Sequence, residues 1–339
     1  MTAHNLAAAL LLAATAAAAP AQGDKPASVP ATTILSPGEA QTKARKDAEK
    51  DREAPLYDEK ADAKTLIDAA LARARKENKR VLVQWGGNWC PWCIRLEKLY
   101  RTDKDIRKEL QYEYETVFVD AGRPSGKNVE FAKKYGADLA QFGFPFLTVL
   151  DADGKPLLNQ ESGSLEVKNA KGESAGVAAG HDPKAVLKLL TDHQAPALKA
   201  DEVLAAAQKK AGADKKLVFL HFGAPWCGWC HRLEGWMDQP ETRTILDRYF
   251  VDCKIDVDRM TGGKDVQDRY TAGKSTGIPV FFFVNGAGKT VATSIGKDGN
   301  IGYPGGDEEA PQFQGMLNAA HVSKADAAAL MASVRIDKK

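Results

Sequence analysis

Short apolar runs alternate with amphipathic, charged segments along most of the chain. Two of these runs, residues 81–85 and 217–222, end at a glycine, and each is followed by a segment with mixed charges and a leucine at helical spacing. Such a run is typical of a buried strand, and the segment after it is typical of a helix. The pattern therefore predicts a strand, a turn and a helix start at two places in the chain.

These two places are copies of one segment. When Cys90 is aligned with Cys227, residues 80–97 fall on residues 217–234, and nine of the eighteen positions are identical. The shared positions are Val81/Val218, Gly86/Gly223, Trp89/Trp226, Cys90/Cys227, Trp92/Trp229, Cys93/Cys230, Arg95/Arg232, Leu96/Leu233 and Glu97/Glu234. A recurrence of this kind indicates a duplicated domain.

The flanking segments repeat as well, in the same order. A helix should begin after Asp62, with its copy starting at Asp201. Their predicted buried residues are Leu66, Ile67, Ala70, Leu71 and Ala74, and then Val203, Leu204 and Ala207. After each motif helix we expect a strand (residues 116–120 and 250–256), a helix containing Tyr135 or Tyr270, and a strand that follows Pro145 or Pro279. Each repeat thus alternates β and α elements.

Each repeat closes with a helix. The first should follow Asp182, which suits an N-cap, and Pro183, which suits the first turn. The second should follow Ser323, with Asp326 completing a start that resembles a capping box. Residues 161–180 and 296–314, both rich in glycine, precede these helices and are predicted to be surface excursions.

The two Cys-x-x-Cys pairs carry the candidate chemistry. Each pair straddles a predicted helix N-terminus, where unpaired amides and the helix dipole favour negative charge. The pKa of a cysteine in such a position falls from about 8.5 to roughly 3.5–7.5. Cys90 and Cys227 are therefore the candidate nucleophiles. Cys93 and Cys230, three residues later, lie close enough to form or resolve a disulfide.

The motif W-C-x-x-C after an apolar strand resembles the thioredoxin superfamily. Members of that family place a cis-proline opposite the cysteines, and Phe144-Pro145 and Ile278-Pro279 match this feature. Residues 233–258 resemble the subgroup that includes the C-terminal domains of periplasmic thiol:disulfide interchange proteins. The resemblance implies an α/β fold with two tandem thioredoxin-like domains. Each would be a mixed central sheet flanked by helices, with an antiparallel proline strand.

The N-terminal segment predicts export. Residues 6–19 form an apolar run before the small-residue site at residues 19–21, as in a secretory signal peptide. The predicted divisions are a signal peptide (1–21), a flexible arm (22–55), domain 1 (56–192), a linker (193–199) and domain 2 (200–339). We expect a periplasmic or secreted protein, without a membrane span after signal removal.

Charge argues against one class of partner, and cysteine content argues against one class of fold. Lysine and arginine number 47 against 45 acidic residues, and the interleaved signs argue against a nucleic-acid surface. Five cysteines are too few for a disulfide scaffold, and four of them form the two pairs. The fifth, Cys253, is predicted to be a small buried hydrophobe in a strand.

The two repeats differ at the position that is usually acidic in thioredoxins. Six residues before the first cysteine, repeat 1 has Gln84 and repeat 2 has His221. Glutamine cannot exchange a proton, whereas histidine titrates near pH 6.5 and could serve Cys230 as a base. The neighbouring strand offers Asp252 as a partner for His221, where repeat 1 has Thr116. Repeat 2 is therefore expected to be the faster redox centre.

All six tryptophans lie near the cysteines. Trp85 and Trp236 are expected in the core, whereas Trp89, Trp92, Trp226 and Trp229 could form an apolar collar around the sulfurs.

The favoured interpretation is an exported thiol-disulfide oxidoreductase that uses protein dithiols, protein disulfides or an upstream electron donor as partners, and needs no cofactor and no metal. Three alternatives stay open. The residues from Cys227 to His231 also match the c-type haem attachment pattern. The two cysteine pairs could form one zinc site. One or both repeats could serve only to bind partners, and Phe144, bulkier than Ile278, makes repeat 1 the better candidate.

Overall fold

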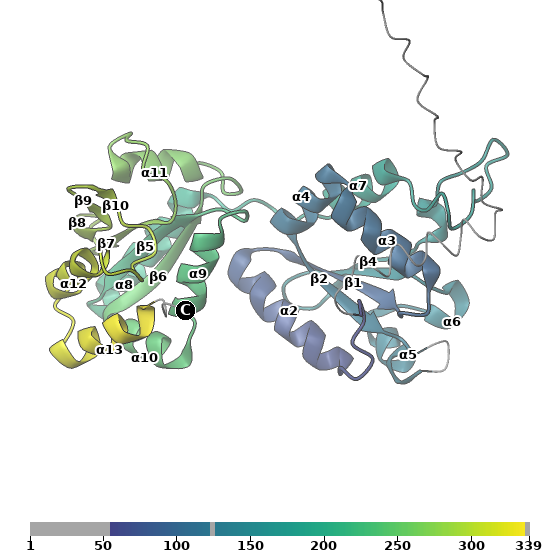
Figure 1. Cartoon of the computed structure of the whole chain (residues 1–339), viewed down its shortest axis with the longest axis horizontal. Coiled ribbons are helices and arrows are strands. Elements are labelled where there is room, and N and C mark those ends of the chain that lie inside the picture. Colours follow the sequence, from purple (N-terminus) through teal and green to yellow (C-terminus); the bar gives the residue numbers. More distant parts are fainter. Residues whose placement is uncertain (1–54, 123–125, 336–339) are drawn as a thin grey trace, which may run out of the picture. The chain divides into compact units, whose positions relative to one another are not determined.

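The computed structural model describes residues 55–122 and 126–335, which contain two four-stranded sheets with helices packed on them (Figure 1). The predicted signal peptide and all but the last residue of the predicted arm lie outside the described residues. In the part of the chain that is described, no helix combines the length and the apolar character needed to cross a membrane.

The first sheet has the strand order β2-β1-β3-β4. Its strands are β1 (Arg80–Gly86), β2 (Tyr114–Asp120), β3 (Phe146–Leu150) and β4 (Pro156–Glu161). β1 runs parallel to β2 and antiparallel to β3, so Val83 is paired with Val117 on one side and with Thr148 on the other. The sheet is mixed and its proline strand is antiparallel, as the resemblance implied.

The second sheet repeats this arrangement, with the order β6-β5-β7-β8. Its strands are β5 (Leu217–Gly223), β6 (Phe250–Asp256), β7 (Val280–Val284) and β8 (Thr290–Thr293). β5 is again parallel to the following strand β6 and antiparallel to the proline strand β7. The duplication and the fold class expected from the sequence are confirmed. A further small sheet pairs β9 (Ile295–Gly296) with β10 (Gly299–Asn300).

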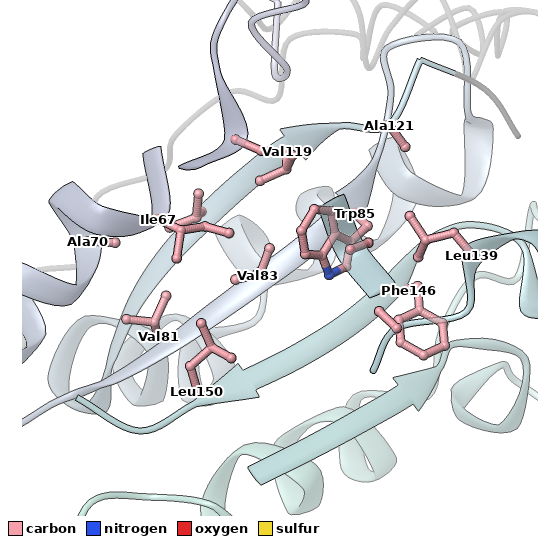
Figure 2. Packing of buried hydrophobic residues seen from close by; sticks show 14 of the residues in the cluster. Ile67, Ala70, Val81, Val83, Trp85, Val119, Ala121, Leu139, Phe146 and Leu150 are labelled. Atoms are coloured by element: carbon pink, nitrogen blue, oxygen red, sulfur yellow. The ribbon is translucent and has the colours of Figure 1, made fainter. Parts of the chain in front are cut away.

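Helix α2 (Ala63–Glu77) covers one face of the first sheet because one of its faces is apolar. Ile67 and Ala70 belong to the same buried cluster as Val81, Val83 and Trp85 of β1 (Figure 2). Leu82 points to the opposite face, as strand alternation requires. There it packs with α3 (Pro91–Thr102), α4 (Lys104–Glu113) and α7 (Pro183–Asp192). The predicted burial along α2 is right except at Leu66, which is half-buried.

The second sheet is covered in the same way. On one face, Leu220 and Phe222 pack with α8 (Ala200–Asp214) and α11 (Gly263–Thr271). On the other, Phe219 packs with α9 (Gly228–Met237), α10 (Pro240–Tyr249), α12 (Ala310–Ala319) and α13 (Lys324–Val334). Trp85 and Trp236 are core residues, as predicted, with 0% and 3% of their surface exposed.

Several helices differ from expectation. α4 and α10 come between each motif helix and the strand that follows, and neither was predicted. α8 begins at Ala200 rather than at Asp201. Tyr270 lies in α11, but Tyr135 ends a 3-10 turn, η1 (Lys133–Tyr135), after the short helix α5 (Lys127–Ala132). The left-handed Gly136 terminates that turn. A second short helix, α6 (Leu139–Phe142), follows before the proline strand.

Candidate active sites

Each cysteine pair lies at the start of the helix that follows the central strand of its sheet. Cys90 is the N-cap of α3 and Cys227 is the N-cap of α9. Both pairs are disulfides, with Cα atoms 5.3 Å apart in the first and 5.2 Å apart in the second. The backbone N–H of Cys93 donates to Cys90 Sγ at 3.2 Å, and that of Cys230 donates to Cys227 Sγ at 3.1 Å. A helix amide aimed at the first sulfur stabilises that sulfur as a thiolate.

The two cysteines of a pair differ in the fraction of their surface that is exposed to solvent. Cys90 and Cys227 each keep 4% of their surface exposed, whereas Cys93 and Cys230 keep 0% and 2%. An incoming sulfur therefore reaches the first cysteine more readily. That Cys90 and Cys227 attack and that Cys93 and Cys230 resolve stays a prediction, with this difference in exposure as support.

The repeated glycine at the end of each central strand makes room for the resolving sulfur. A Cβ on Gly86 would lie 2.5 Å from Cys93 Sγ, and one on Gly223 would lie 3.4 Å from Cys230 Sγ. The first distance is far inside van der Waals contact. A close approach of backbone and sulfur thus requires a glycine at position 86, whereas at position 223 the fit is only tight.

The prolines lie beside the cysteines. The peptide bonds Phe144–Pro145 and Ile278–Pro279 are both cis. Cys227 Sγ lies 3.6 Å from the carbonyl oxygen of Ile278, so the segment before Pro279 faces the second centre. At the first centre, the ring of Phe144 packs edge-on against Trp89, with ring centroids 5.3 Å apart.

The motif tryptophans are more accessible in repeat 2 than in repeat 1. Trp226 and Trp229 are 57% and 55% exposed, against 38% for Trp89, and Trp92 is half-buried. The Trp226 indole donates to Asp258 Oδ2 at 2.8 Å, which fixes that ring while its face stays open. An apolar collar at the sulfurs is therefore open to partners around Cys227 and partly covered around Cys90.

One ring packs on the tryptophan inside each cysteine pair, and these rings come from His181, directly after the predicted excursion 161–180, and from Tyr303, within the predicted excursion 296–314. The ring of His181 lies edge-on to Trp92 at 5.4 Å, and the ring of Tyr303 stacks on Trp229 at 6.1 Å. His181 is 4% exposed and Tyr303 is 9% exposed, so both are buried. The prediction of a surface excursion was therefore wrong at Tyr303, because its ring packs on Trp229 of the redox helix.

Burial also changes the chemistry of His181. Neither of its ring nitrogens has a hydrogen-bond partner among the described residues. Loss of solvation lowers the pKa of His181 from 6.5 to about 4, since a buried imidazolium is costly. The ring is therefore neutral at physiological pH.

His221 and Asp252 meet as the sequence predicted. His221 is 1% exposed, and its Nε2 lies 3.0 Å from Asp252 Oδ1. Arg243, on the unpredicted helix α10, donates to Asp252 Oδ2 at 3.2 Å. Burial alone would raise the pKa of Asp252, but the hydrogen bond from His221 and the charges of His221 and Arg243 hold that pKa well below its usual range. The aspartate therefore stays charged beside the ring.

A second buried pair lies next to Cys230. Lys254 Nζ is 2.9 Å from both carboxylate oxygens of Glu234, and Glu234 is 6% exposed. A Cβ on Gly223 would lie 3.6 Å from Glu234 Oε1 and 3.4 Å from Cys230 Sγ. The carboxylate and the resolving sulfur therefore share one side of Gly223. Glu234 is one of the repeated residues, and the sequence pattern alone indicates no role for it.

The equivalent surroundings of Cys93 are different. Glu97 is also buried, but it pairs with Arg101, whose Nε lies 3.0 Å from Glu97 Oε1. Phe118 is paired with Gln84 across the strands, in the place that Lys254 takes opposite His221. Gln84 instead donates to the hydroxyl of Tyr57 at 2.7 Å. Tyr57 could not be predicted from the sequence, because it comes before the first predicted element and belongs to no periodic pattern.

Two other predicted positions behave as structural residues. Cys253 is a free cysteine, 3% exposed, and burial raises the pKa of its thiol to about 12. It is thus a buried apolar side chain, as predicted. His231 Nε2 lies 2.8 Å from the carbonyl oxygen of Pro225. This contact ties the helix to the turn before it.

Comparison with known proteins agrees with this geometry. A family model described as a thioredoxin-like domain matches residues 67–170, and a second, described as thioredoxin-like, matches residues 199–286. Protein disulfide-isomerase erp38 of Neurospora crassa is 27% identical over 222 residues, a match that covers 62% of this chain and 52% of that protein. The chain therefore spans about half the length of this curated relative.

Solved structures with similarity include the disulphide isomerase from Xylella fastidiosa Temecula1. It is 27% identical, with a TM-score of 0.34, over 42% of this chain and 98% of that chain. The oxidised C-terminal domain of DsbD from Neisseria meningitidis is 24% identical, with a TM-score of 0.24, over 32% of this chain and 90% of that chain. With two thioredoxin-like matches in tandem, over two sheets of the same strand order, this chain belongs to the thioredoxin superfamily.

Proposed function

We propose that the chain is an exported thiol-disulfide oxidoreductase that exchanges electrons with protein dithiols and disulfides through two centres. The observation that carries this function is the disulfide at the N-terminus of α3 and of α9, where a helix amide donates to the more accessible sulfur. That arrangement favours a thiolate on Cys90 and Cys227. The similarity to a protein disulfide-isomerase supports the same activity. The predicted signal peptide supports export.

The chemistry proceeds by two thiolate attacks and uses only the chain's own sulfurs. In the reduced second centre, the Cys227 thiolate attacks a substrate disulfide, forms a mixed disulfide and releases one substrate sulfur as a thiolate. Cys230 then attacks Cys227 Sγ, which closes the internal disulfide and releases the second substrate sulfur. Two electrons pass to the substrate, and the reverse sequence oxidises a dithiol. Cys90 and Cys93 act in the same way.

The partner is proposed to be an extended protein segment that carries a cysteine. Such a segment would lie beside Pro279, where the carbonyl of Ile278 is 3.6 Å from the attacking sulfur, and against the exposed rings of Trp226 and Trp229. Aromatic faces next to a reactive group give contact area without sequence specificity. At the first centre, Phe144 and Trp89 already pack on each other, which leaves less open surface.

The test uses two full-length variants that each keep one cysteine pair. One carries Cys227→Ser and Cys230→Ser, and the other carries Cys90→Ser and Cys93→Ser. Each should form one reversible internal disulfide in a glutathione redox titration and should reduce a model protein disulfide. A chain without either pair serves as the control. Exchange by neither variant would contradict the proposal, and exchange by the second centre alone would assign the first repeat to partner binding.

A substitution at His221 tests how the second centre handles protons. In the chain that keeps only Cys227 and Cys230, His221→Gln imitates repeat 1 and should slow exchange by about tenfold or more, because it removes the proposed base. The rate should be followed against pH, with Glu234→Gln as the matched variant at the neighbouring carboxylate. An unchanged rate and pH profile would make His221 structural. A change only with Glu234→Gln would transfer the proton-accepting role to Glu234.

A further inference from the structure

Asn300 lies in a tight turn of repeat 2 and contacts the loop beside the second redox centre. It is the last residue of β10, which pairs with β9 so that Asn300 is opposite Ile295. Gly299 and Gly302 have φ angles of 118° and 59°, which a residue with a side chain rarely adopts. These two glycines let the chain bend sharply before and after Asn300, whose side chain is half-buried.

The side-chain amide of Asn300 uses all of its hydrogen-bonding capacity. Its Nδ2 donates to the carbonyl oxygen of Pro279 at 2.9 Å and to that of Thr276 at 3.2 Å. Its Oδ1 accepts from the hydroxyl of Ser294 at 2.8 Å and from the backbone N–H of Gly302 at 3.3 Å. An asparagine amide has two protons to donate and one oxygen with two lone pairs. The four contacts therefore fix both the position and the orientation of this amide.

Ser294 connects Asn300 to the proline strand β7. Ser294 is 0% exposed, and its hydroxyl oxygen accepts from the backbone N–H of Phe281 at 2.9 Å while its own proton is donated to Asn300. The backbone N–H of Ser294 also donates to the carbonyl oxygen of Phe281 at 2.9 Å. Ser294 and Asn300 together therefore hold the backbone both before and after Ile278.

Ile278 is the residue of this loop that faces the attacking sulfur. Its carbonyl oxygen lies 3.6 Å from Cys227 Sγ. The contacts of Asn300 are made to the residue directly after Ile278 and to the residue two positions before it. Asn300 therefore positions the loop 276–279 next to Cys227.

The equivalent side chain of the first repeat makes different contacts. Gln160 is paired with Leu147, in the place that Ser294 takes opposite Phe281. The side-chain amide of Gln160 donates to the next carbonyl oxygen along the chain and to Ser164 Oγ, both at 2.8 Å. Both N–H groups of this amide are thereby used near the end of β4. The contact from an amide to the loop beside the cysteines is thus a feature of repeat 2.

We propose that Asn300 is a positioning residue that holds the loop 276–279 beside Cys227 and so raises the affinity of the second centre for protein partners. This inference rests on the proposed function, in which an extended partner segment lies beside Pro279. A partner that binds a fixed loop loses no free energy in ordering it, whereas a partner that binds a mobile loop must order that loop first. The exchange of bonds between sulfur atoms needs no contact with Asn300.

The test is Asn300→Asp in the full-length chain that keeps only Cys227 and Cys230. A carboxylate cannot donate, and one of its oxygens would face the two carbonyl oxygens that the amide now binds. In single turnovers of the reduced centre, the half-saturating concentration of a peptide disulfide should rise about tenfold, the size expected for one or two lost hydrogen bonds. The maximal rate should change by less than about twofold. Opening of the oxidised centre by dithiothreitol, a small thiol, should keep its rate.

Asn285→Asp is the matched control, because the same chemical change there removes no donor that the turn uses. Asn285 Oδ1 accepts from the backbone N–H of Ala287 at 3.0 Å and from that of Lys289 at 2.9 Å. Asp151 accepts the equivalent two hydrogen bonds in repeat 1. The control should therefore leave the half-saturating concentration and both rates unchanged.

Hydrogen exchange followed by mass spectrometry tests the loop without any partner. The amides of residues 274–281 should exchange about tenfold faster in Asn300→Asp than in the parent chain. Asn300→Ala, which removes the amide without adding a charge, should show the same changes and takes the place of Asn300→Asp if circular dichroism shows that the carboxylate prevents folding.

Two results would overturn the proposal: unchanged hydrogen exchange of this segment, or faster exchange with an unchanged half-saturating concentration of peptide. A loss of the dithiothreitol reaction together with the peptide reaction would also contradict it, because Asn300 would then act on the sulfurs. If the segment exchanges faster while the parent chain reduces no peptide at all, the positioning of the loop by Asn300 is supported and the proposed function of the second centre fails.

Discussion

Replacing Cys227 with serine is expected to abolish disulfide exchange at the second centre, whereas replacing Cys230 should trap substrates as mixed disulfides. Cys227 is the more accessible sulfur and receives the amide N–H of Cys230 at 3.1 Å. A serine hydroxyl is not ionised there and cannot attack a disulfide. Without Cys230, the first attack still occurs, but nothing within the chain releases the substrate from Cys227.

The measurement uses the chain whose first pair is serine, so that only the second centre is observed. Cys227→Ser should lower the exchange rate to the uncatalysed background. In Cys230→Ser, the Cys227 thiolate should attack a peptide disulfide, release one peptide sulfur as a thiolate and keep the other peptide as a mixed disulfide, visible by mass spectrometry and released by reductant. Cys253→Ser is the matched control and should leave the rate unchanged, because this thiol is buried and its pKa is raised to about 12. Full activity of Cys227→Ser would reverse the assignment of attacking and resolving sulfurs.

The elements that could be predicted from the sequence are those with a local signal. β1 and β5 were predicted because an apolar run ends in a glycine, and the cysteines were placed correctly because a helix start follows directly. α4 was missed because its N-cap, Asp103, comes directly after the last residue of α3, Thr102. The charged stretch therefore continues without a visible break. α10 has Pro240 in its first turn, which is the one local signal in the sequence for the start of this helix.

The site residues also divide into those that a local sequence signal predicts and those that it does not. His221 and Asp252 could be paired from sequence because each lies on a predicted strand, and consecutive strands of alternating β and α elements usually lie side by side, as β5 and β6 do. Arg243 could not be added, since it lies on a helix that was not predicted. Tyr57 contacts Gln84 across 27 residues of sequence, and no periodic pattern leads from one to the other. Contacts of this kind are fixed by the assembled fold and not by local preference.

The same limit applies to the two rings that pack on the motif tryptophans. His181 and Tyr303 each contact the tryptophan inside a Cys-x-x-Cys pair, but they do not occupy equivalent positions of the two repeats. Aligning the repeats therefore gives no hint that the two contacts correspond. Only the folded structure reveals that each repeat packs a ring against this tryptophan.

His181 should make the stability of the first repeat depend on pH. Burial lowers its pKa from 6.5 to about 4, so between these values the unfolded chain binds more protons than the folded one. The contribution of neutral His181 to the free energy of unfolding is therefore fully present above pH 6.5 and is lost as the pH falls toward 4. A shift of this size corresponds to at most about 3 kcal/mol of unfolding free energy.

The measurement is hydrogen exchange at the amides of β1 and β3 in the full-length chain between pH 4 and 8, converted to free energies of opening. His181→Phe keeps a ring against Trp92 and removes the two unpartnered nitrogens. Above pH 7 it should leave the free energy of opening nearly unchanged. Below pH 6.5 it should reduce the loss of stability with falling pH. Leu190→Ala, in the same repeat, is the control, and it should lower stability by about 2–5 kcal/mol equally at every pH, because it creates a cavity without a titrating group. If wild type and His181→Phe lose stability in parallel as the pH falls, protonation of His181 is not the cause, and the acid sensitivity of the first repeat has its origin in its carboxylates.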